Sequence, residues 1–248
     1  MKVIIRTILV LLVMVMTNSV VYAESDPEHW DAKAVGVLRQ MDDYTDSMGK
    51  FVINVESYLD ASLGAGLIIS NAGKTTISVD RSGSLHSITR SGSQVNEIFL
   101  HKGVLTVYSD EHKFFTRADV PEALNDGLMF ALEEFAVETP VQDLLVLKSL
   151  ESLVSKEADV IYVSGDSSIR GVDCHHVLIS GPLVDMQVWI AKGDKPLPTR
   201  TLMTSKVVQG LPRHDVFQEW RATDGFEATE FQFEPPEGAR EIGFINTP

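Results

Sequence analysis

The sequence predicts a mainly β (α+β) fold: a large curved antiparallel sheet or unclosed β-barrel, with an N-terminal helix and a mid-chain helical lid on its concave face. Three observations lead to this prediction. Apolar and polar residues alternate with period two from Phe51 to Arg117, and again from Asp159 to Arg221. Between these regions, apolar residues follow one another over 121–153 without turn signals, as in helices. A sheet of about eleven strands tends to curl rather than stay flat.

The first 23 residues have the features of a secretory signal peptide. Lys2 and Arg6 form a short basic region, an apolar run covers 8–16, and Val21-Tyr22-Ala23 ends in small residues at −3 and −1. We expect cleavage after Ala23 and export to the periplasm. A transmembrane helix is the weaker interpretation, because a span needs about 20 apolar residues and polar residues at 17–19 interrupt this run.

Residues 24–248 are expected to form a single domain, because no low-complexity linker divides them. The chain has 21 Lys and Arg residues against 35 Asp and Glu residues, a net charge of −14. This balance argues against nucleic-acid binding, which needs cations to neutralise phosphates, and against adhesion to an anionic membrane surface. We also expect no stable membrane insertion after signal cleavage. Cys174 is the only cysteine, so stability must come from packing rather than from disulfides.

A helix is predicted to start at Ser25-Asp26-Pro27, where a capping residue precedes Pro at the first helical position. Gly49 is its expected end. Its apolar stripe has three- and four-residue spacing and consists of Trp30, Ala34, Leu38, Met41, Tyr44 and Met48.

Short strands separated by turn signals follow this helix. Phe51, Ile53 and Val55 share one face of the first strand, and Asn71-Ala72-Gly73 predicts a turn. The expected strands of this first meander lie near 51–56, 66–71, 75–81, 85–90, 95–101, 104–109 and 113–117.

Two helices are expected in the middle of the chain, at 121–137 and from Pro140 to about Leu153. Asp194 to Pro198 predicts a turn before an edge strand, because Pro presets φ and cannot donate to a ladder. The expected strands of the second meander lie near 159–164, 168–180, 184–191, 199–208, 214–221 and 231–233.

Three segments of the second half carry a recognisable pattern: Gln187-Val188-Trp189-Ile190, Gly193-Asp194-Lys195-Pro196-Leu197-Pro198, and the tail from Phe231 to Ala239. With these motifs the chain, from about Asp26 onward, resembles a family of predicted periplasmic proteins of unknown function. That family is similar to the LolA/LolB-type lipoprotein-carrier superfamily. The resemblance implies an unclosed β-barrel whose helices form a lid over a hydrophobic cavity.

The resemblance also implies a functional Arg, for which Arg81 and Arg90 are both candidates. The residue directly after the predicted cleavage site is not a Cys, which excludes the outer-membrane-anchored receptor variant of the superfamily.

A lid over a curved sheet would enclose an apolar cavity. The candidate lining residues on the helices are Leu128, Phe130, Leu132, Phe135, Leu144 and Leu147; those on the strands are Phe51, Ile53, Val55, Met186 and Val188. The alternative is an ordinary packed core built from the same residues. The two differ in whether space remains for a ligand.

Asp173-Cys174-His175-His176 is the one cluster that suggests catalysis. Neighbours on a strand point to opposite faces, so Cys174 and His175 diverge, and the two histidines cannot chelate one metal. Cys174 and His176 share a face but lie two residues apart, and a half-buried strand is the favoured interpretation. We expect no enzymatic activity, no cofactor and no metal site.

The favoured function is a soluble periplasmic binding or carrier protein that holds a lipid, an acyl chain or another hydrophobic ligand. The alternative is a protein-interaction or envelope-stress sensor module on the same scaffold, with a periplasmic protein partner and no bound lipid. A third hypothesis is a hydrolase that uses Cys174 and His176.

Overall fold

Period-two alternation builds one large β-sheet. The computed structural model describes residues 30–63, 67–146 and 160–244. In the first half of the chain the strands are β1 (Lys50–Ser62), β2 (Ile68–Asp80), β3 (Ser84–Ser91), β4 (Gln94–His101), β5 (Val104–Ser109) and β6 (Phe114–Asp119). In the second half they are β7 (Val160–Ile169), β8 (Val172–Ser180), β9 (Val184–Ala191), β10 (Pro198–Ser205), β11 (Arg213–Ala222) and β12 (Arg240–Glu241).

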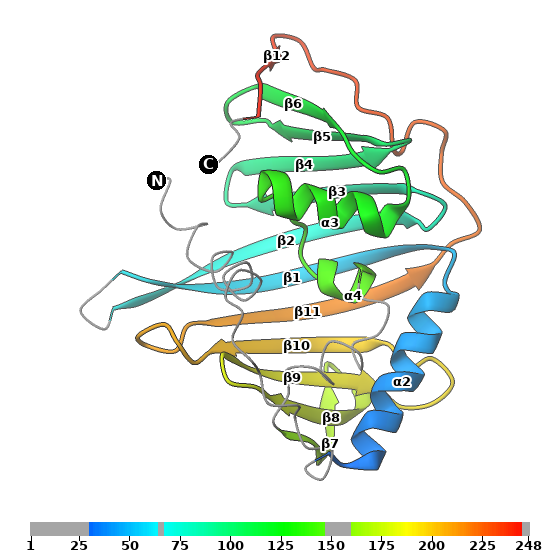
Figure 1. Ribbon diagram of the computed structural model, residues 1–248, viewed down its shortest axis with the longest axis vertical. Helices are drawn as coiled ribbons and strands as arrows, with labels where there is room; N and C mark the ends of the chain where they lie inside the picture. The colour runs from blue at the N-terminus through cyan, green and yellow to red at the C-terminus, as the bar shows by residue number, and fades with distance from the viewer. Residues whose placement is uncertain (1–29, 64–66, 147–159, 245–248) are drawn as a thin grey trace.

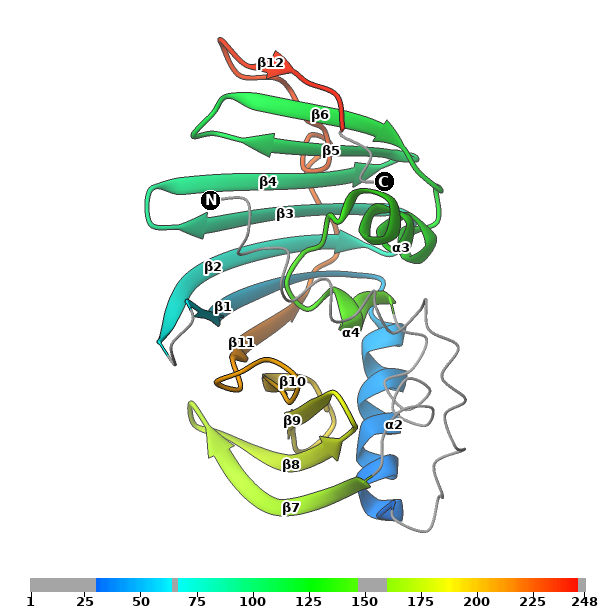
Figure 2. The same ribbon diagram turned by 60° about the vertical axis from the view of Figure 1, so that its left-hand side comes forward.

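The two meanders join where β1 pairs with β11. The strand order is β12-β6-β5-β4-β3-β2-β1-β11-β10-β9-β8-β7. The short β12 pairs with β6 in parallel, whereas the other neighbouring strands are antiparallel. The sheet curves strongly (Figure 2), and β7 and β12 stand at its two open edges. The predicted fold class, an unclosed curved sheet with helices on one face, is confirmed.

Three described helices cover one face of this sheet (Figure 1): α2 (Ala32–Ser47), α3 (Leu124–Phe135) and α4 (Gln142–Val146). We call the covered side the inner face; it carries Phe51, Ile53 and Val55. The outer face carries their neighbours along β1. None of the described helices combines the length and the apolar character needed to cross a membrane.

Helix α2 starts where a side chain caps it. Asp31 is the N-cap, and its Oδ1 accepts a hydrogen bond from Lys33 N at 2.8 Å. This bond satisfies one of the free N–H groups of the first turn. The predicted start at Ser25-Asp26-Pro27 lies outside the described residues, and Trp30 precedes the helix in an isolated bridge with Ile161.

The predicted turn at Asn71-Ala72-Gly73 is wrong. These residues lie within β2, where Ala72 is opposite Tyr58 and Gly73 is opposite Ser57 of β1. The two strands of 13 residues each pair along their whole length. Long-range pairing therefore overrides the local turn preference of Asn and Gly.

Two further strand predictions are also wrong. Pro198 does begin a strand, but β10 lies between β9 and β11 rather than at an edge. A bulge between Pro198 and Arg200 accommodates the proline there.

Residues 231–233 form no strand. The tail after β11 instead runs along the sheet to β12 (Figure 1), and Phe233 packs with ring centroids 5.2–5.4 Å from Phe99, Tyr108 and Phe115. The Phe-x-Phe-x-Pro-Pro motif thus attaches the tail to the outer face of the first meander.

Candidate functional site

The inner face of the first meander forms one apolar cluster with α3 and α4. Phe51, Ile53 and Val55 are at most 2% exposed and pack with Leu128 of α3. The other buried members are Met48, Ile77, Val79, Leu85, Leu100, Leu124, Leu145 and Val216. Four of the predicted lining residues are therefore brought together here.

Gly127 allows this close approach of α3. A Cβ at this position would lie 2.7 Å from the Pro121 carbonyl oxygen and 3.0 Å from Leu100 Cδ1. Only a residue without a side chain fits between α3 and β4 without displacing its neighbours.

A second apolar cluster lies under α2. Val188 is fully buried in this cluster, and Met186 and Leu144 pack against the cluster. The other buried members are Ala34, Val37, Leu38, Met41, Ile161, Val177, Ile179 and Ile190. Of the eleven predicted lining residues, four thus lie in the cluster under α3 and α4, and three lie in or against the cluster under α2.

The remaining lining residues belong to neither cluster or lie outside the described residues. Phe130 and Phe135 are half-buried on α3, with ring centroids 5.9 Å apart in an edge-to-face arrangement, and Phe135 stacks on Phe244 at 4.3 Å. Leu132 is buried. Leu147 lies outside the described residues, so its predicted place in the lining stays a prediction.

Arg81, one of the two candidate arginines, connects the helices to the sheet. Its Nη2 donates to the Thr45 carbonyl of α2 at 3.1 Å, and its Nη1 donates to the Leu145 carbonyl of α4 at 3.4 Å. Asp46 lies 3.6 Å from the same Nη2. Burial lowers the pKa of Arg81, and Asp46 partly opposes that effect. Arg90, the other candidate, is exposed on β3.

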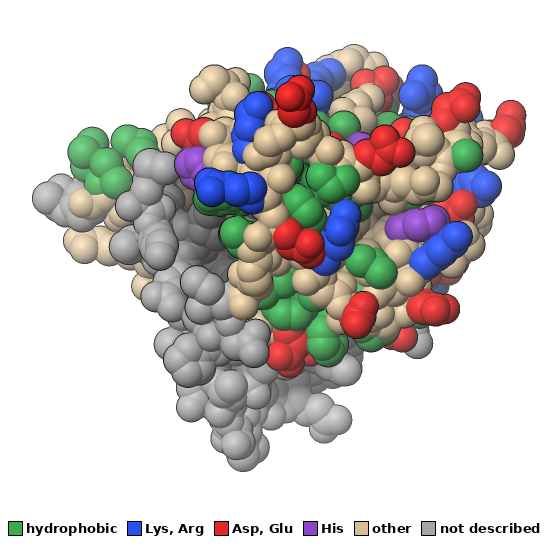
Figure 3. Space-filling model, turned by 90° about the horizontal axis from the view of Figure 1, so that it is seen from above, with side chains coloured by type: hydrophobic (Ala, Val, Ile, Leu, Met, Phe, Trp, Pro, Cys, Tyr) green, Lys and Arg blue, Asp and Glu red, His purple; other side chains and the backbone are tan. Residues whose placement is uncertain are grey.

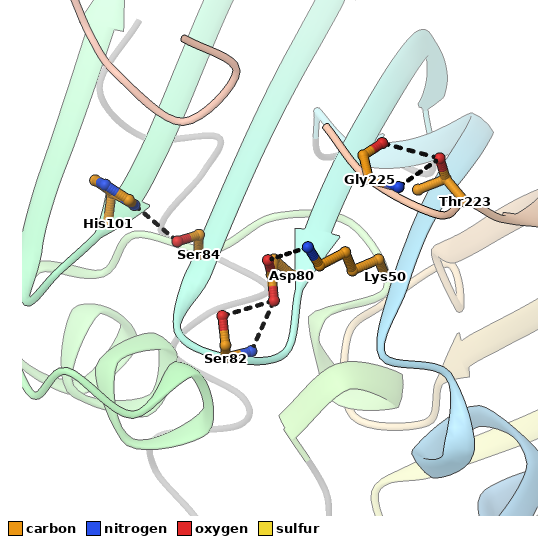
Figure 4. Close-up of polar contacts among 7 residues, drawn as sticks. All are labelled: Lys50, Asp80, Ser82, Ser84, His101, Thr223 and Gly225. Atoms are coloured by element: carbon orange, nitrogen blue, oxygen red, sulfur yellow. Dashed lines mark hydrogen bonds and ion pairs between the residues drawn. The ribbon is translucent and has the colours of Figure 1, made fainter. Parts of the chain in front are cut away.

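The β2–β3 turn that carries Arg81 is held by polar contacts (Figure 4). Asp80 accepts hydrogen bonds from Ser82 N at 3.0 Å and Ser82 Oγ at 2.7 Å, and it pairs with Lys50 at 3.4 Å. Burial alone would raise the pKa of Asp80, but these bonds outweigh it and the pKa is lowered. Next to the turn, Ser84 Oγ bonds His101 Nδ1 at 2.7 Å.

The inner face also carries polar side chains that the sequence analysis missed. Gln218 is buried opposite Val55; its Nε2 donates to Thr201 Oγ1 at 2.9 Å, and its Oε1 accepts from Trp220 Nε1 at 3.1 Å. His214 is on the same face, and burial lowers its pKa despite Asp215. The period-two alternation of Val216, Gln218 and Trp220 along β11 could have identified Gln218 as an inner-face residue.

The outer face has its own cleft of about 540 Å³ between β1, β2, β11 and the β7–β8 turn. Arg170 lies in this turn and donates to Glu56 Oε2 at 2.6 Å. Its guanidinium also lies 4.3 Å from the ring centroid of Phe217, and Lys74 pairs with Glu56 at 3.3 Å. The two cations that line this cleft, Arg170 and Lys74, are thus already paired with Glu56.

Cys174 and His176 have separate partners. The Cys174 Sγ is buried, 3.3 Å from the Val172 carbonyl and 3.3 Å from Thr199 Oγ1. The His176 ring stacks on Trp189 at 4.3 Å and bonds to Ser164 and Gln187. Burial lowers the pKa of His176. Within the described parts of the chain, no hydrogen bond links the thiol to this imidazole, and no three His, Cys, Asp or Glu side chains group as a metal site.

Comparison with known proteins gives similar solved structures. An uncharacterized conserved protein from Thermus thermophilus is 11% identical over 85% of this chain and 99% of that chain, with a TM-score of 0.49. The lipoprotein LppX from Mycobacterium tuberculosis is 12% identical over 76% and 94%, with a TM-score of 0.48. A LolA superfamily protein from Nitrosomonas europaea is 12% identical over 79% and 96%, with a TM-score of 0.39.

The search of curated proteins finds no match. A family model does match: its description is "Predicted periplasmic protein (DUF2092)", and it covers residues 34–245. This range includes both meanders and the helices α3 and α4 between them. The chain therefore belongs to the DUF2092 family of predicted periplasmic proteins.

Proposed function

We propose that this protein is a periplasmic carrier or binding protein that holds a lipid, an acyl chain or another hydrophobic ligand between the inner face and the helices. The observation that supports it is the arrangement of that face. Helices α2, α3 and α4 are not part of the sheet and meet it through two separate apolar clusters. Half-buried Leu144 and Met186 pack against the second cluster, and Phe130 and Phe135 are half-buried on α3.

Export is the second part of the proposal. The signal peptide is cleaved after Ala23, and residues 24–248 act in the periplasm as one domain. The family description supports this location, and the basic, apolar and small-residue pattern of residues 1–23 supports the cleavage site.

Apolar burial provides enough free energy for such a ligand. A buried methylene contributes about 0.8 kcal/mol, so an acyl chain of about sixteen carbons contributes on the order of 10 kcal/mol. Part of this offsets the cost of separating helices from the sheet and of immobilising the chain.

Arg81 is the residue that we propose to control this separation. Its guanidinium bonds carbonyl oxygens of α2 and α4 at once, so both helices stay on the sheet while these bonds are intact. Exposed Arg90 makes no comparable link to a described helix. The proposed carrier mechanism thus assigns the functional Arg to Arg81.

Binding of a fluorescent long-chain fatty acid tests the site. Phe130→Gln puts a polar group beside the proposed ligand and is expected to weaken binding at least about tenfold. Glu133→Gln, an exposed change on the same helix, is the matched control and should bind like wild type. Equal affinities of the two variants, with unchanged circular dichroism, would exclude a ligand at this helix.

A further inference from the structure

One end of the sheet exposes aliphatic side chains from two neighbouring hairpins. Leu63 and Leu67 flank the β1–β2 turn and are 52% and 57% exposed, and Val207 and Leu211 of the β10–β11 loop are 52% and 55% exposed. Together with Ile69, these residues form what we call the hairpin-tip surface. Isolated exposed aliphatic residues are common, but a group of them at one end marks a binding surface.

The two hairpins lie side by side in both ribbon views (Figures 1 and 2), and contacts hold them together. A Cβ on Gly210 would lie 2.9 Å from Ile68 Cδ1. Below the tips, Asp60 Oδ2 accepts from Arg213 N at 3.1 Å and from Arg213 Nε at 3.4 Å. The aliphatic side chains therefore belong to one supported surface. From above, hydrophobic side chains are visible at the extremity reached by the β1–β2 hairpin (Figure 3).

The β1–β2 tip carries no charged residue. The sequence has no charged residue from Ala61 to Gly73, although the whole chain carries −14. The nearest cations are already paired: Arg213 with Asp60, and Lys206 with Asp185 at 2.7 Å. Because the two hairpin tips present no unpaired charged side chain, this surface can approach a lipid headgroup layer with little electrostatic repulsion.

From these observations we propose that the hairpin-tip surface docks on a lipid bilayer by inserting its aliphatic side chains into the headgroup–acyl boundary. Protruding Leu, Ile and Val side chains suit a fluid apolar layer. A protein partner is the less suitable occupant, because interface hot spots are enriched in Trp, Tyr and Arg and depleted in Leu and Val. This surface contains no aromatic residue and no unpaired Arg.

The hairpin-tip surface also continues the inner face. Along β1, alternate residues lead from Val55 through Ser57 and Leu59 to Ala61, and Leu63 follows just after the strand ends. Docking at the tip would place the membrane at the end of this row. The docking itself does not depend on the proposed carrier function, since it needs no ligand on the inner face.

Vesicle flotation tests the proposal with the protein purified after export. Phosphatidylcholine vesicles are the probe, and vesicles with added phosphatidylglycerol are the comparison. We expect wild type to bind phosphatidylcholine, and Leu63→Ser/Leu67→Ser to lower the partition coefficient at least about tenfold. The matched control, Val104→Ser/Ile242→Ser, changes two exposed aliphatic residues elsewhere and should bind like wild type.

Salt and a position-specific probe sharpen the result. Salt screens interactions between charges but not the burial of apolar side chains. Binding to phosphatidylcholine should therefore persist at roughly 0.5 M salt, well above the 0.1 M at which the Debye length is about 10 Å. An environment-sensitive dye on Leu67→Cys should shift to the blue on vesicles, whereas the same dye on Val104→Cys should not. Absence of binding by wild type, or equal losses in the tip and control variants, would overturn the proposal. The proposal would also be overturned if the tip variants bound vesicles as wild type does but no longer formed a cross-link to a protein that wild type cross-links.

Discussion

Arg170 Nη2 lies 2.6 Å from Glu56 Oε2, although the two residues are 114 positions apart in the chain. Arg170 is in the β7–β8 turn, and Glu56 is in β1, with β9, β10 and β11 between β8 and β1 in the sheet. The same guanidinium covers Phe217 at 4.3 Å. This contact holds the curled end of the second meander against the outer face at the junction of the two meanders.

Arg170→Ala should lower the stability of the protein. The change removes the ion pair and the stacking on Phe217, and a cation–π contact at an exposed site contributes about 0.5–1 kcal/mol. Urea denaturation followed by circular dichroism measures the shift. Arg90→Ala, at an exposed position on β3, is the control and should leave the midpoint unchanged; a similar shift in both variants would show that the contact contributes nothing specific.

The contribution of Glu56 should depend on pH. Hydrogen bonds from Arg170 and Lys74 lower the pKa of Glu56 below its ordinary value of 4.5. A carboxylate with a lowered pKa stabilises the folded state above its ordinary pKa, and that stabilisation is lost as pH falls through the folded-state pKa. Wild type should therefore exceed Glu56→Gln in stability at pH 7, and the difference should shrink below pH 4.5. A difference in stability between wild type and Glu56→Gln that stayed constant from pH 7 to about pH 3, below the ordinary pKa of Glu, would contradict this interpretation.

Gly127→Ala should destabilise the protein, although Ala normally favours helices. The new Cβ would meet the Pro121 carbonyl oxygen at 2.7 Å, and forcing α3 outward costs about 1–3 kcal/mol. Gly36→Ala in α2 is the matched control, because nothing lies within 4 Å of a Cβ there. That variant should gain about 0.5–1 kcal/mol. A higher free energy of unfolding in Gly127→Ala, like the gain expected for Gly36→Ala, would show that α3 is not closely packed.

Phe233→Ala should release the C-terminal tail. The ring loses contacts with Phe99, Tyr108 and Phe115 and with the guanidinium of Arg117 at 5.7 Å. For this half-buried ring we expect a loss of about 1–3 kcal/mol, below the 3–5 kcal/mol of a fully buried Phe. Hydrogen exchange should accelerate in the tail and at the β6–β12 pairing, while exposed Glu234→Ala leaves both unchanged. Exchange that stays slow in Phe233→Ala would mean that other contacts hold the tail.

Arg81→Leu should loosen α4 and the end of α2. Without the guanidinium, the carbonyls of Thr45 and Leu145 lose a donor, and a hydrogen bond from a charged group contributes about 1.5–3 kcal/mol. Hydrogen exchange in residues 41–48 and 142–146 should accelerate, and the fatty-acid probe should exchange faster. Arg90→Leu provides the comparison, and equal exchange rates in the two variants would remove Arg81 from its proposed role.

The sequence was sufficient for features that depend on short-range periodicity. Alternation along β1 and β9 placed Phe51, Ile53, Val55 and Val188 on buried faces, and all four are buried. Local turn preference was less reliable, because the pairing of β2 with β1 draws Gly73 into a strand.

Contacts that depend on the order of strands in the sheet could not be predicted from the sequence. Around the junction of β1 with β11, four of the predicted lining residues lie in one cluster and three lie in or against a second. The same junction brings Arg170 to Glu56, and no local pattern predicts a contact across 114 residues. The role of Phe233 was also missed, because its aromatic partners come from three different strands.

Mass spectrometry of an organic extract tests the carrier function most directly. The protein is purified from periplasm without detergent, and the extract is compared with that of the Phe130→Gln variant. The proposed function predicts a lipid or acyl species in near-stoichiometric amount with wild type and a reduced amount with the variant. An extract of wild type that contains no such species, from protein that also fails to bind the fatty-acid probe, would contradict it and favour the protein-interaction alternative.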